Sequence, residues 1–296
     1  MSEPVINIVM NCYNGEHYLK KSLESILSQT FKNWELIFWD NCSTDRSAEI
    51  FHKYKDPRLH YFKSEKHTSQ YEARKNAMLK TKRELVAFLD VDDWWDKNKL
   101  EKQVKLFDNK RIGFSCSNYW IVNQNKNFKK NIVFKKIPGG QVLSKLLKKN
   151  FIGMSTLMIR RKLYFELKYG FDSRFEIVGD YDLVLRLSIK NELGTLQEPL
   201  SYYRWHDNNL SHEIGKNARE LRYMYNEMKK NDLFRSNKSF GYFKDFTFYL
   251  SSLSHKLEGN ILKSFNEAIN IENFFLKVRI LLIIFLPLKF VKYIRS

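Results

Sequence analysis

The first 110 residues or so alternate between short apolar runs and segments whose apolar residues recur with helical spacing. The apolar runs, which favour strands, occupy 6–10, 34–40, 58–62 and 85–90. The segments with helical spacing follow them in turn, at 15–27, 43–55, 69–82 and 97–107. Continuous rather than alternating apolar strands are typical of a parallel sheet that helices cover on both faces. The pattern therefore predicts an α/β fold with a mostly parallel sheet.

The later part of the chain changes in character. Further strands are predicted at 155–161 and 199–206, with an amphipathic helix at 179–190 between them. The stretch 121–150 contains eight lysines and no acidic residue, and we expect it to form an exposed excursion. After about residue 212 the pattern is helical. We therefore predict a catalytic-type α/β domain at 1–211 and a C-terminal helical region at 212–296.

Polar residues stand where the predicted strands end. Asn11 follows the first strand, Asp40 ends the second, and Asp90, Asp92 and Asp93 end the fourth. In open parallel sheets, ligands bind in the crevice outside the carboxyl ends of the strands. The sequence therefore predicts a binding site at this edge of the sheet.

The three aspartates belong to the stretch LVAFLDVDDWW, directly after a buried apolar run. One or two of them would serve as helix caps, because Asp is a favoured capping residue. Three adjoining carboxylates also repel one another, and a bound cation relieves that repulsion. Oxygen ligands at this density suit Mg²⁺ or Mn²⁺, which one or two carboxylates hold together with substrate phosphates. Capping and metal binding are both open at this point, and metal binding implies a ligand with a diphosphate.

The common phosphate-binding loops are missing from the sequence. It contains no G-x-x-x-x-G-K-[ST] motif, and no G-x-G-x-x-G follows the first predicted strand. This argues against a P-loop NTPase and against a dinucleotide-binding dehydrogenase.

Two stretches resemble the family 2 glycosyltransferases of the GT-A fold. The first is INIVMNCYNGEHYLKKSLESILSQTFKNWELIFWDNCSTDRS, in which a strand ends in Tyr-Asn, a helix ends in Ser-Gln-Thr, and a second strand leads to Ser-Thr-Asp. The second is AFLDVDDWW, which resembles the Asp-x-Asp motif of that family. The resemblance implies a Rossmann-like GT-A sheet with helices on both faces. It also implies an inverting, metal-dependent transfer from a nucleotide-diphosphate sugar, most commonly a UDP-sugar.

The resemblance assigns roles to individual residues. Tyr13 and Asp40 match positions that hold the base and ribose, and Arg74 matches a basic residue near the base and the diphosphate. Asp92 would be the principal ligand of the Mn²⁺ or Mg²⁺ ion, and Asp90 would contact the ribose or the metal. The implied nucleotide-binding set is Asn11, where the family often has Pro, with Tyr13, Asp40, Arg74, Asp90, Arg204 and His206.

Two later segments complete the resemblance. FEIVGDYDLVLRLS is similar to a Glu-Asp-Tyr-Asp-Leu segment whose first Asp is the catalytic base, and this implies that Asp180 is the base. YYRWHDNNLS is similar to a Tyr-Arg-x-His segment near the donor phosphates, which nominates Arg204 and His206. Gly179 stands where the family has Glu, and Asn41 where it often has a second Asp.

Two tryptophans, Trp94 and Trp95, follow the aspartates directly. They are either ordinary packing residues or an aromatic surface that stacks on the acceptor sugar. The Gln-x-x-Arg-Trp motif of processive polysaccharide synthases does not occur, and this favours the transfer of a single sugar per encounter.

The net charge of +18 implies attraction to something anionic. Two other classes of protein would account for it: a non-catalytic module that binds nucleic acid or a membrane surface, and a nucleotidyltransferase on a similar sheet. A nucleic acid would be repelled by Asp40, Asp90, Asp92 and Asp180, and a nucleotidyltransferase would be expected to carry a glycine-rich basic loop after its first strand. We therefore expect no nucleic acid partner.

The C-terminal stretch FFLKVRILLIIFLPLKFVKYIRS, residues 274–296, is the most apolar part of the chain. Its uncharged core of nine residues, 280–288, is shorter than the roughly 20 residues that a spanning helix needs. Lys277, Arg279, Lys289, Lys292 and Arg295 flank this core, and such flanks favour a segment that lies on an anionic membrane surface. The alternative is a helix packed against the rest of the protein. The first interpretation predicts a cytoplasmic protein at the inner face of the cell membrane, acting on a glycan or lipid-linked glycan in polysaccharide assembly.

Overall fold

The computed structural model describes residues 6–123, 128–131, 136–207 and 209–293. The chain divides into two compact units. The sheet unit comprises Met1–Val142 and Phe151–Asp207, and the helical unit comprises Leu143–Asn150 and Asn208–Ser296.

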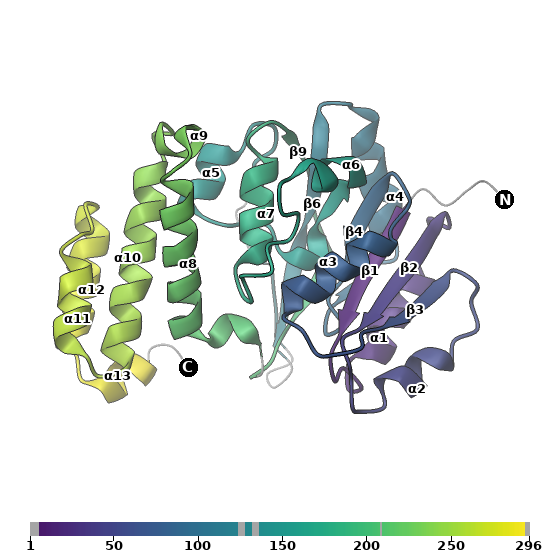
Figure 1. Cartoon of the computed structure of the whole chain (residues 1–296), viewed down its shortest axis with the longest axis horizontal. Helices are drawn as coiled ribbons and strands as arrows, with labels where there is room; N and C mark the ends of the chain where they lie inside the picture. Colours follow the sequence, from purple (N-terminus) through teal and green to yellow (C-terminus); the bar gives the residue numbers. More distant parts are fainter. Residues whose placement is uncertain (1–5, 124–127, 132–135, 208, 294–296) are drawn as a thin grey trace. The chain divides into compact units, whose positions relative to one another are not determined.

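The sheet unit contains all of the strands that the structure describes (Figure 1). These are β1 (Ile6–Cys12), β2 (Trp34–Asp40), β3 (Leu59–Lys63), β4 (Leu85–Phe88), β5 (Trp94–Trp95), β6 (Ile112–Asn123), β7 (Phe128–Asn131), β8 (Met158–Arg160) and β9 (Glu192–Trp205). Its helices are α1 (Leu19–Leu27), α2 (Ser47–His52), α3 (Gln70–Lys80), α4 (Lys99–Val104), α6 (Arg161–Glu166) and α7 (Gly179–Leu187), with 3-10 turns η1 (Lys105–Asp108) and η2 (Met154–Thr156).

The sheet has the order β3-β2-β1-β4-β8-β6-β9-β5, with β7 pairing with β6. Strands β3, β2, β1 and β4, drawn in purple and blue in Figure 1, are parallel to one another. Beyond β4 the sheet is mixed, because β8 runs antiparallel to both β4 and β6, whereas β9 runs parallel to β6. The prediction of an α/β fold is confirmed, and the parallel pairing holds for the N-terminal half of the sheet.

Both faces of β1 are covered, as its continuous apolar run predicts. Ile6, Ile8 and Met10 point to one face and are buried in a core that side chains of α1, α2 and α4 complete. Side chains alternate along a strand, so Asn7 and Val9 face the other way, where α3 crosses β1 and β2. Helix α3 begins at Gln70 because the side chain of the preceding serine caps it by accepting a hydrogen bond from the third residue of the helix.

The structure corrects two expectations about the middle of the chain. Strand β6 was not anticipated, because small and polar residues such as Ser115, Ser117 and Asn118 interrupt its apolar run although they are buried. The stretch 121–150 is not simply an exposed excursion, since Ile137 and Leu146 are buried. Residues 124–127 and 132–135 of this stretch lie outside the described residues.

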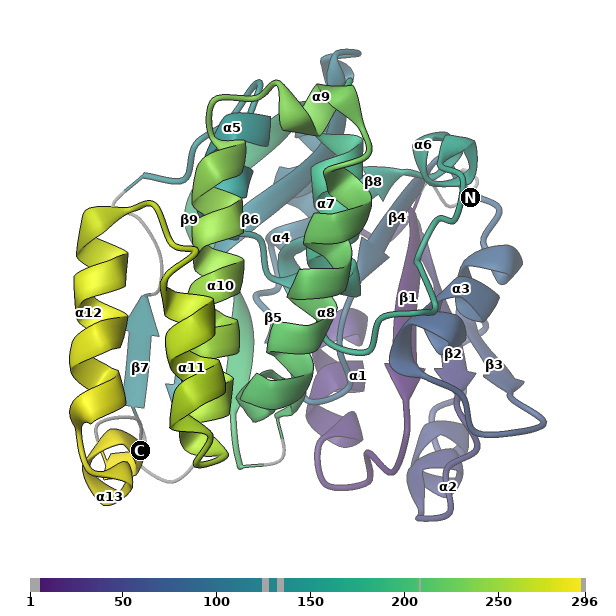
Figure 2. The same ribbon diagram turned by 60° about the vertical axis from the view of Figure 1, so that its left-hand side comes forward.

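The helical unit is built around one long central helix. Helix α10 lies between α8 on one side and α11 and α12 on the other, and both views show this arrangement (Figures 1 and 2). The helices of the unit are α5 (Leu143–Lys148), α8 (Ile214–Met228), α9 (Asp232–Arg235), α10 (Phe240–Leu257), α11 (Ile261–Ala268), α12 (Phe274–Phe285) and α13 (Leu288–Tyr293), with the 3-10 turn η3 (Leu210–His212). No helix among the described residues is both long enough and apolar enough to cross a membrane.

The C-terminal stretch forms two helices, α12 and α13, which are separated at Leu286 and Pro287. Ile280 and Ile284 of α12 are buried in the core of the helical unit, so one side of this stretch packs as an ordinary helix. Its other side is exposed, with Phe275 81% and Phe285 77% accessible. The side chain of Lys292 and the whole of Arg295 lie outside the part of the chain that the structure describes.

Candidate active site

The three aspartates that follow β4 have three different environments. Asp90 forms an ion pair with Arg74 of α3, whose side chain is 4% exposed. Asp92 is partly exposed, and its Oδ2 lies 3.1 Å from Nε2 of His206. Asp93 is fully buried. Repulsion among the three carboxylates is thus reduced by a separate partner for each.

Asp93 is a structural carboxyl group. Its Oδ2 accepts a hydrogen bond from Ser155 Oγ at 2.5 Å, and its Oδ1 accepts one from the backbone N–H of Arg204 at 2.9 Å. Burial, followed by the charges of Asp92 and Asp90, raises its pKa well above the usual range of an aspartate. The side chain therefore joins the segment after β4 to η2 and to the end of β9, and it leaves Asp92 as the aspartate that faces the site.

The end of β9 supplies Arg204 and His206 to this edge of the sheet. Nε of Arg204 donates a hydrogen bond to the backbone oxygen of Asp92 at 2.7 Å. The ring of His206 stacks on Tyr18 with centroids 5.0 Å apart, and the Arg204 guanidinium lies 5.0 Å from the centroid of the same Tyr18 ring. The structure therefore places Arg204 and His206, the two residues nominated from the Tyr-Arg-x-His segment, next to Asp92. Sequence reasoning missed Tyr18, which stands just before α1 and shows no signal in the sequence.

Asp180 lies in the first turn of α7, which begins at Gly179. Its Oδ1 accepts a hydrogen bond from the N–H of Tyr181 at 2.7 Å, and Val178 rather than Asp180 is the N-cap residue. Burial raises the pKa of Asp180 to about 6, against the opposing effect of the Arg74 guanidinium. The carboxylate is thus a stronger base than an ordinary aspartate, and its charge interacts with Arg74 beside Asp90.

The glycine at position 179 has a local explanation. A Cβ added to Gly179 would lie 2.6 Å from a ring carbon of Tyr71. That ring is buried, and its hydroxyl donates a hydrogen bond to the backbone oxygen of Ile177 at 3.1 Å. The ring of Tyr71 occupies the space that a glutamate side chain would need.

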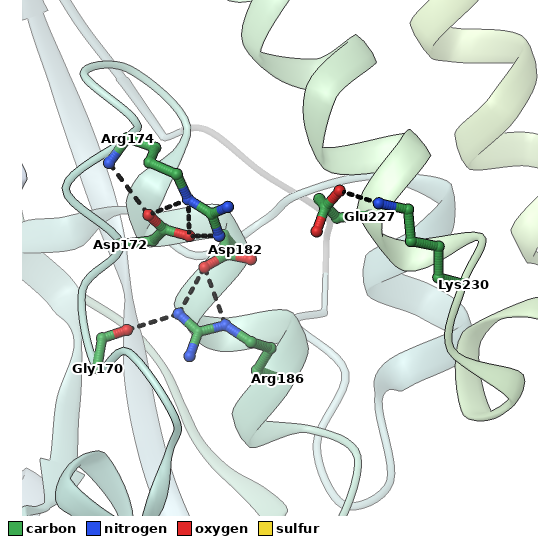
Figure 3. Close-up of polar contacts among 7 residues, drawn as sticks. All are labelled: Gly170, Asp172, Arg174, Asp182, Arg186, Glu227 and Lys230. Carbon is green, nitrogen blue, oxygen red and sulfur yellow. Dashed lines mark hydrogen bonds and ion pairs between the residues drawn. The ribbon is translucent and has the colours of Figure 1, made fainter.

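The segment before Asp180 is held by two arginine–aspartate pairs (Figure 3). Arg174 Nε donates to both carboxylate oxygens of Asp172, at 2.9 and 3.0 Å. Arg186 of α7 donates from Nη2 to Asp182 at 2.5 Å and to the backbone oxygen of Gly170 at 2.6 Å. The second pair ties α7 to the loop that leads into it, and so it fixes the direction in which the helix starts.

The nucleoside end of the predicted site is formed by the loops after β1 and β2. Tyr13 is 49% exposed, and its ring centroid lies 4.0 Å from that of His67. Asn14 and Cys42 have positive φ angles of 51° and 71°, and among the described residues they are the only ones other than glycine to do so. Such backbone conformations gather at functional sites more often than elsewhere.

Asp40 and Asn11, two of the residues predicted to bind the nucleotide, make hydrogen bonds within the protein. Asp40 is 0% exposed, and its carboxylate accepts hydrogen bonds from Ser43 N at 2.7 Å and from the hydroxyl of Tyr61 at 2.5 Å. Both carboxylate oxygens of Asp40 thus support these loops, and the contact of Asp40 with a nucleotide stays a prediction. The side chain of Asn11 donates to the backbone oxygen of Gln70 at 3.2 Å, and its contact with a nucleotide stays a prediction.

The two tryptophans differ. Trp95 is 3% exposed, belongs to the main core, and donates from its indole N–H to the backbone oxygen of Ser155 at 2.7 Å. Trp95 is a packing residue of this core, and its contact with the acceptor stays a prediction. Trp94 is partly exposed and stacks on Tyr202 with centroids 5.1 Å apart, while the Lys21 ammonium lies 3.4 Å from its ring centroid. A role for Trp94 on the acceptor side stays a prediction.

Residues 7–167 match the family described as Glycosyl transferase family 2. The chain is 29% identical over 77% of its length to the putative teichuronic acid biosynthesis glycosyltransferase TuaG of Bacillus subtilis, of which it covers 90%. It is 32% identical over 66% of its length to the Escherichia coli enzyme WfgD, of which it covers 74%. The name of WfgD is UDP-Glc:alpha-D-GlcNAc-diphosphoundecaprenol beta-1,3-glucosyltransferase.

Two solved structures have a similar fold at low sequence identity. The first is S. aureus TarS 1–349 in complex with UDP-GlcNAc, with a TM-score of 0.65, 15% identity and coverage of 88% of both chains. The second is the mannosyltransferase PcManGT of Pyrobaculum calidifontis in complex with GDP-Man and Mn²⁺. Its TM-score is 0.59 at 16% identity, with coverage of 91% of this chain and 74% of that one.

Proposed function

The chain belongs to glycosyl transferase family 2, and we propose that it transfers a single sugar from a nucleoside-diphosphate sugar to an acceptor hydroxyl, with inversion at the anomeric carbon. The observation that carries the proposal is the convergence of Asp92 with His206, Asp90 with Arg74, and Asp180 at one edge of the sheet. Asp92 and His206 supply oxygen and nitrogen ligands for a cation that would bind beside a diphosphate. Asp180 supplies a separate carboxylate with a raised pKa.

The donor in our proposal is a UDP-sugar. The name of WfgD includes UDP-Glc, and TarS binds UDP-GlcNAc in the structure that resembles this fold. The exposed ring of Tyr13 next to His67 offers a surface on which a base can stack, since aromatic rings of this kind pack face to face with other planar groups. The nucleoside would then lie over the loops after β1 and β2, and its diphosphate would point to Asp92.

Asp92 and His206 fit a divalent cation. Two neighbouring ligands of an octahedral ion with bonds of about 2.1 Å stand about 3 Å apart, and Asp92 Oδ2 lies 3.1 Å from His206 Nε2. Among the described residues no three His, Cys, Asp or Glu side chains are arranged to hold a metal on their own, and substrate phosphates commonly supply the remaining ligands of Mg²⁺ and Mn²⁺. The ion, Mn²⁺ or Mg²⁺, would stabilise the negative charge that builds on the departing diphosphate. Asp90 forms an ion pair with Arg74, so we propose that Asp90 orients the Arg74 guanidinium.

Asp180 is the general base in this proposal. Its carboxylate would accept the proton of the acceptor hydroxyl while that oxygen attacks the anomeric carbon, and the bond to the diphosphate oxygen would break on the opposite face of the sugar. A pKa of about 6 leaves the group ionised at neutral pH and raises its affinity for a proton relative to an ordinary aspartate. The hydrogen bond from Tyr181 N to Oδ1 holds the carboxylate in place.

The acceptor in our proposal is a lipid-linked glycan used in cell-surface polysaccharide assembly. The name of WfgD describes a diphosphoundecaprenol-linked acceptor, and the name of TuaG refers to teichuronic acid biosynthesis. Such an acceptor is held at a membrane, so its enzyme needs access to the membrane surface.

The helical unit offers an apolar surface for this purpose. We define the outer apolar face as the exposed side chains Leu262 of α11 and Phe274, Phe275, Leu282 and Phe285 of α12, which are 65–81% accessible. Exposed apolar surface of this kind, bordered by cations, is typical of protein segments that lie in a membrane interface. Lys277, Arg279 and Lys289 supply the cations on α12 and α13. The occupant we propose is therefore the anionic inner face of the cell membrane.

A donor screen tests the proposed function. A panel of UDP- and GDP-sugars would be incubated with the full chain and Mn²⁺, and the released nucleoside diphosphate would be measured with and without lipid-linked acceptor. We expect turnover of one UDP-sugar that depends on the acceptor and stops in EDTA. Release of nucleoside diphosphate from none of the donors, in the presence of a range of lipid-linked acceptors, would contradict the proposal.

A further inference from the structure

A pocket lined mostly by charged residues lies in the sheet unit, at the end of β4 opposite Asp90. It has a volume of about 480 Å³, within the usual range for small-ligand sites. Its walls come from the turn before β4, the start of β6, the end of β8 with the start of α6, and the turn before β9. The lining residues are Lys82, Arg83, Glu84, Lys110, Gly113, Arg160, Arg161, Lys162, Leu163 and Asn191.

The register of the sheet fixes the position of this pocket. Arg160 of β8 pairs with Leu85, the first residue of β4, whereas Asp90 follows the other end of β4. Asp90 lies six positions after Glu84, and at about 3.3 Å per residue an extended segment of this length spans roughly 20 Å. A diphosphate bound at Asp92 therefore does not reach the pocket, and a ligand of the pocket is a different group.

Six of the ten lining residues are lysine or arginine, and one is acidic. Two of the six cations already have partners: Arg160 pairs with Glu84 at 2.6 Å, and Arg83 pairs with Glu35 at 2.8 Å. Glu84, the single acidic residue of the lining, is therefore already paired with Arg160. A buried arginine with a local carboxylate is part of the fold rather than of a binding surface.

Four cations are left without a carboxylate partner among the described residues. They are the exposed Lys82, Lys110 and Lys162, and the partly exposed Arg161. Arg161 is held in place because its Nε donates to Thr81 Oγ1 at 3.0 Å and its guanidinium lies 4.4 Å from the ring centroid of Phe165. Its outer nitrogens have no hydrogen-bond partner within the described ranges, so they remain available to a ligand.

Like charges gathered around one concave space raise each other's free energy, and an anion in that space lowers it. A guanidinium fork together with ammonium groups is the combination that best matches the several oxygens of a phosphate. The volume exceeds that of a single phosphate and leaves room for a second phosphoryl group or for the carbon atoms attached to it. The pocket thus has the charge, donors and size for one small phosphate-bearing ligand.

We propose that this pocket binds a phosphate- or diphosphate-bearing anion at a site separate from the donor site. Two sources offer the same chemistry, a free phosphate compound and the phosphate headgroup of an anionic lipid. This proposal rests on the pocket alone and does not depend on the reaction proposed above.

The test compares two triple variants that remove the same charge. The pocket variant carries Lys82→Gln, Lys110→Gln and Lys162→Gln, and the control variant carries Lys55→Gln, Lys97→Gln and Lys229→Gln, which are exposed lysines outside the pocket. Binding of inorganic diphosphate is measured by isothermal titration calorimetry in EDTA, a condition under which the proposed donor site lacks its cation. We expect binding to the unmodified protein and to the control, and at least tenfold weaker binding to the pocket variant. The Asp92→Asn variant should bind diphosphate like the unmodified protein.

Vesicles distinguish the two sources. If the pocket variant alone loses affinity for phosphatidylglycerol vesicles, the ligand is a lipid headgroup; if both triples bind such vesicles equally, the ligand is a free phosphate compound. Equal loss of diphosphate binding in both triples, or no binding to the unmodified protein, would overturn the proposal. Should the pocket variant unfold, the single substitution Lys162→Glu replaces it. We expect this variant also to bind inorganic diphosphate more weakly, because it places a carboxylate in the pocket.

Discussion

Three carboxylates are partly or fully buried at the carboxyl edge of the sheet, although such groups ordinarily face water. Phenylalanine and leucine side chains, which ordinarily fill cores, face outward on α11 and α12. In the first region each displaced group has a partner within the protein: Arg74 for Asp90, His206 for Asp92, and Ser155 for Asp93. In the second region the outer apolar face is exposed, and no described residue of its own unit covers it. Burying a charge and exposing a large apolar group both cost free energy.

The difference between the two regions indicates what each is for. A buried carboxylate with an internal partner keeps a fixed position and a shifted pKa, which are the properties that a catalytic edge needs. An exposed apolar face leaves its cost uncompensated by the part of the chain that the structure describes, and this favours an occupant outside the protein. In our proposal the first region is completed by a cation and a nucleotide-sugar donor, whereas the second region contacts a membrane surface. The following experiments test this comparison in order of expected effect.

Replacing Asp180 with asparagine should have the largest effect. Asparagine has nearly the same size and can still accept the hydrogen bond from Tyr181, but it cannot take up a proton. We expect turnover to fall by about 10²–10⁴, the usual contribution of a positioned general base, with little change in the melting temperature. Asp108→Asn, at an exposed position, is the matched control. Near-normal turnover of Asp180→Asn with the natural acceptor would remove Asp180 from the role of base.

Removing the Asp182 carboxylate, whose partner Arg186 lies on the same helix, should lower the free energy of unfolding. Asp182 and Arg186 have side-chain exposures of 13% and 19%, and Asp182→Ala would leave the guanidinium of Arg186 without its carboxylate. Loss of one member of such a pair costs about 3 kcal/mol of unfolding free energy, measurable by urea denaturation. The double variant Asp182→Ala, Arg186→Met should recover part of this loss, because it also removes the unpaired charge. A single variant as stable as the unmodified protein would show that the pair contributes little.

The variant Asp92→Asn tests whether the divalent cation binds at Asp92. A nucleoside diphosphate at about 100 times its dissociation constant should add about 2.7 kcal/mol to stability, provided that Mn²⁺ is present. Asp92→Asn should abolish this Mn²⁺-dependent stabilisation in thermal unfolding, whereas Asp108→Asn should keep it. Full stabilisation by the nucleotide in EDTA would be incompatible with a metal bridge at Asp92.

How much of these regions the sequence predicts differs from residue to residue. The strand 34–40 is predicted with its observed bounds, because a short apolar run carries that information. Asp92, His206 and Asp180 are nominated by the resemblance of their segments to the family. The sequence leaves packing open as one role of Trp95, but it does not show the hydrogen bonds that anchor Asp93 and Trp95, since both are made with Ser155, some 60 residues away. The two faces of α12 likewise become distinct only once Ile280 and Ile284 are seen to be buried.

The pH dependence of the reaction follows from the raised pKa of Asp180. A base must be deprotonated to act, and its pKa in the folded protein is about 6. We expect kcat/KM to be level above pH 7 and to fall about tenfold for each pH unit below 6. The measurement is initial velocity at low donor concentration from pH 4.5 to 8.5, after checking by circular dichroism that the protein stays folded. A plateau that extends below pH 5 would mean that the essential base has an ordinary pKa, as an exposed carboxylate has.

The smallest effect is expected for the cations beside the outer apolar face. Deleting the whole tail would disturb the core of the helical unit, because Ile280 and Ile284 are buried there, so point substitutions are the better test. Lys277→Gln and Lys289→Gln should each weaken binding to anionic vesicles by about 1 kcal/mol, or roughly fivefold, as measured by flotation. Lys55→Gln with Lys97→Gln, in the sheet unit, removes the same charge and should have a smaller effect. Flotation that is equally poor with neutral and anionic vesicles would show that α12 and α13 contact no membrane, and the outer apolar face would then need an occupant of another kind.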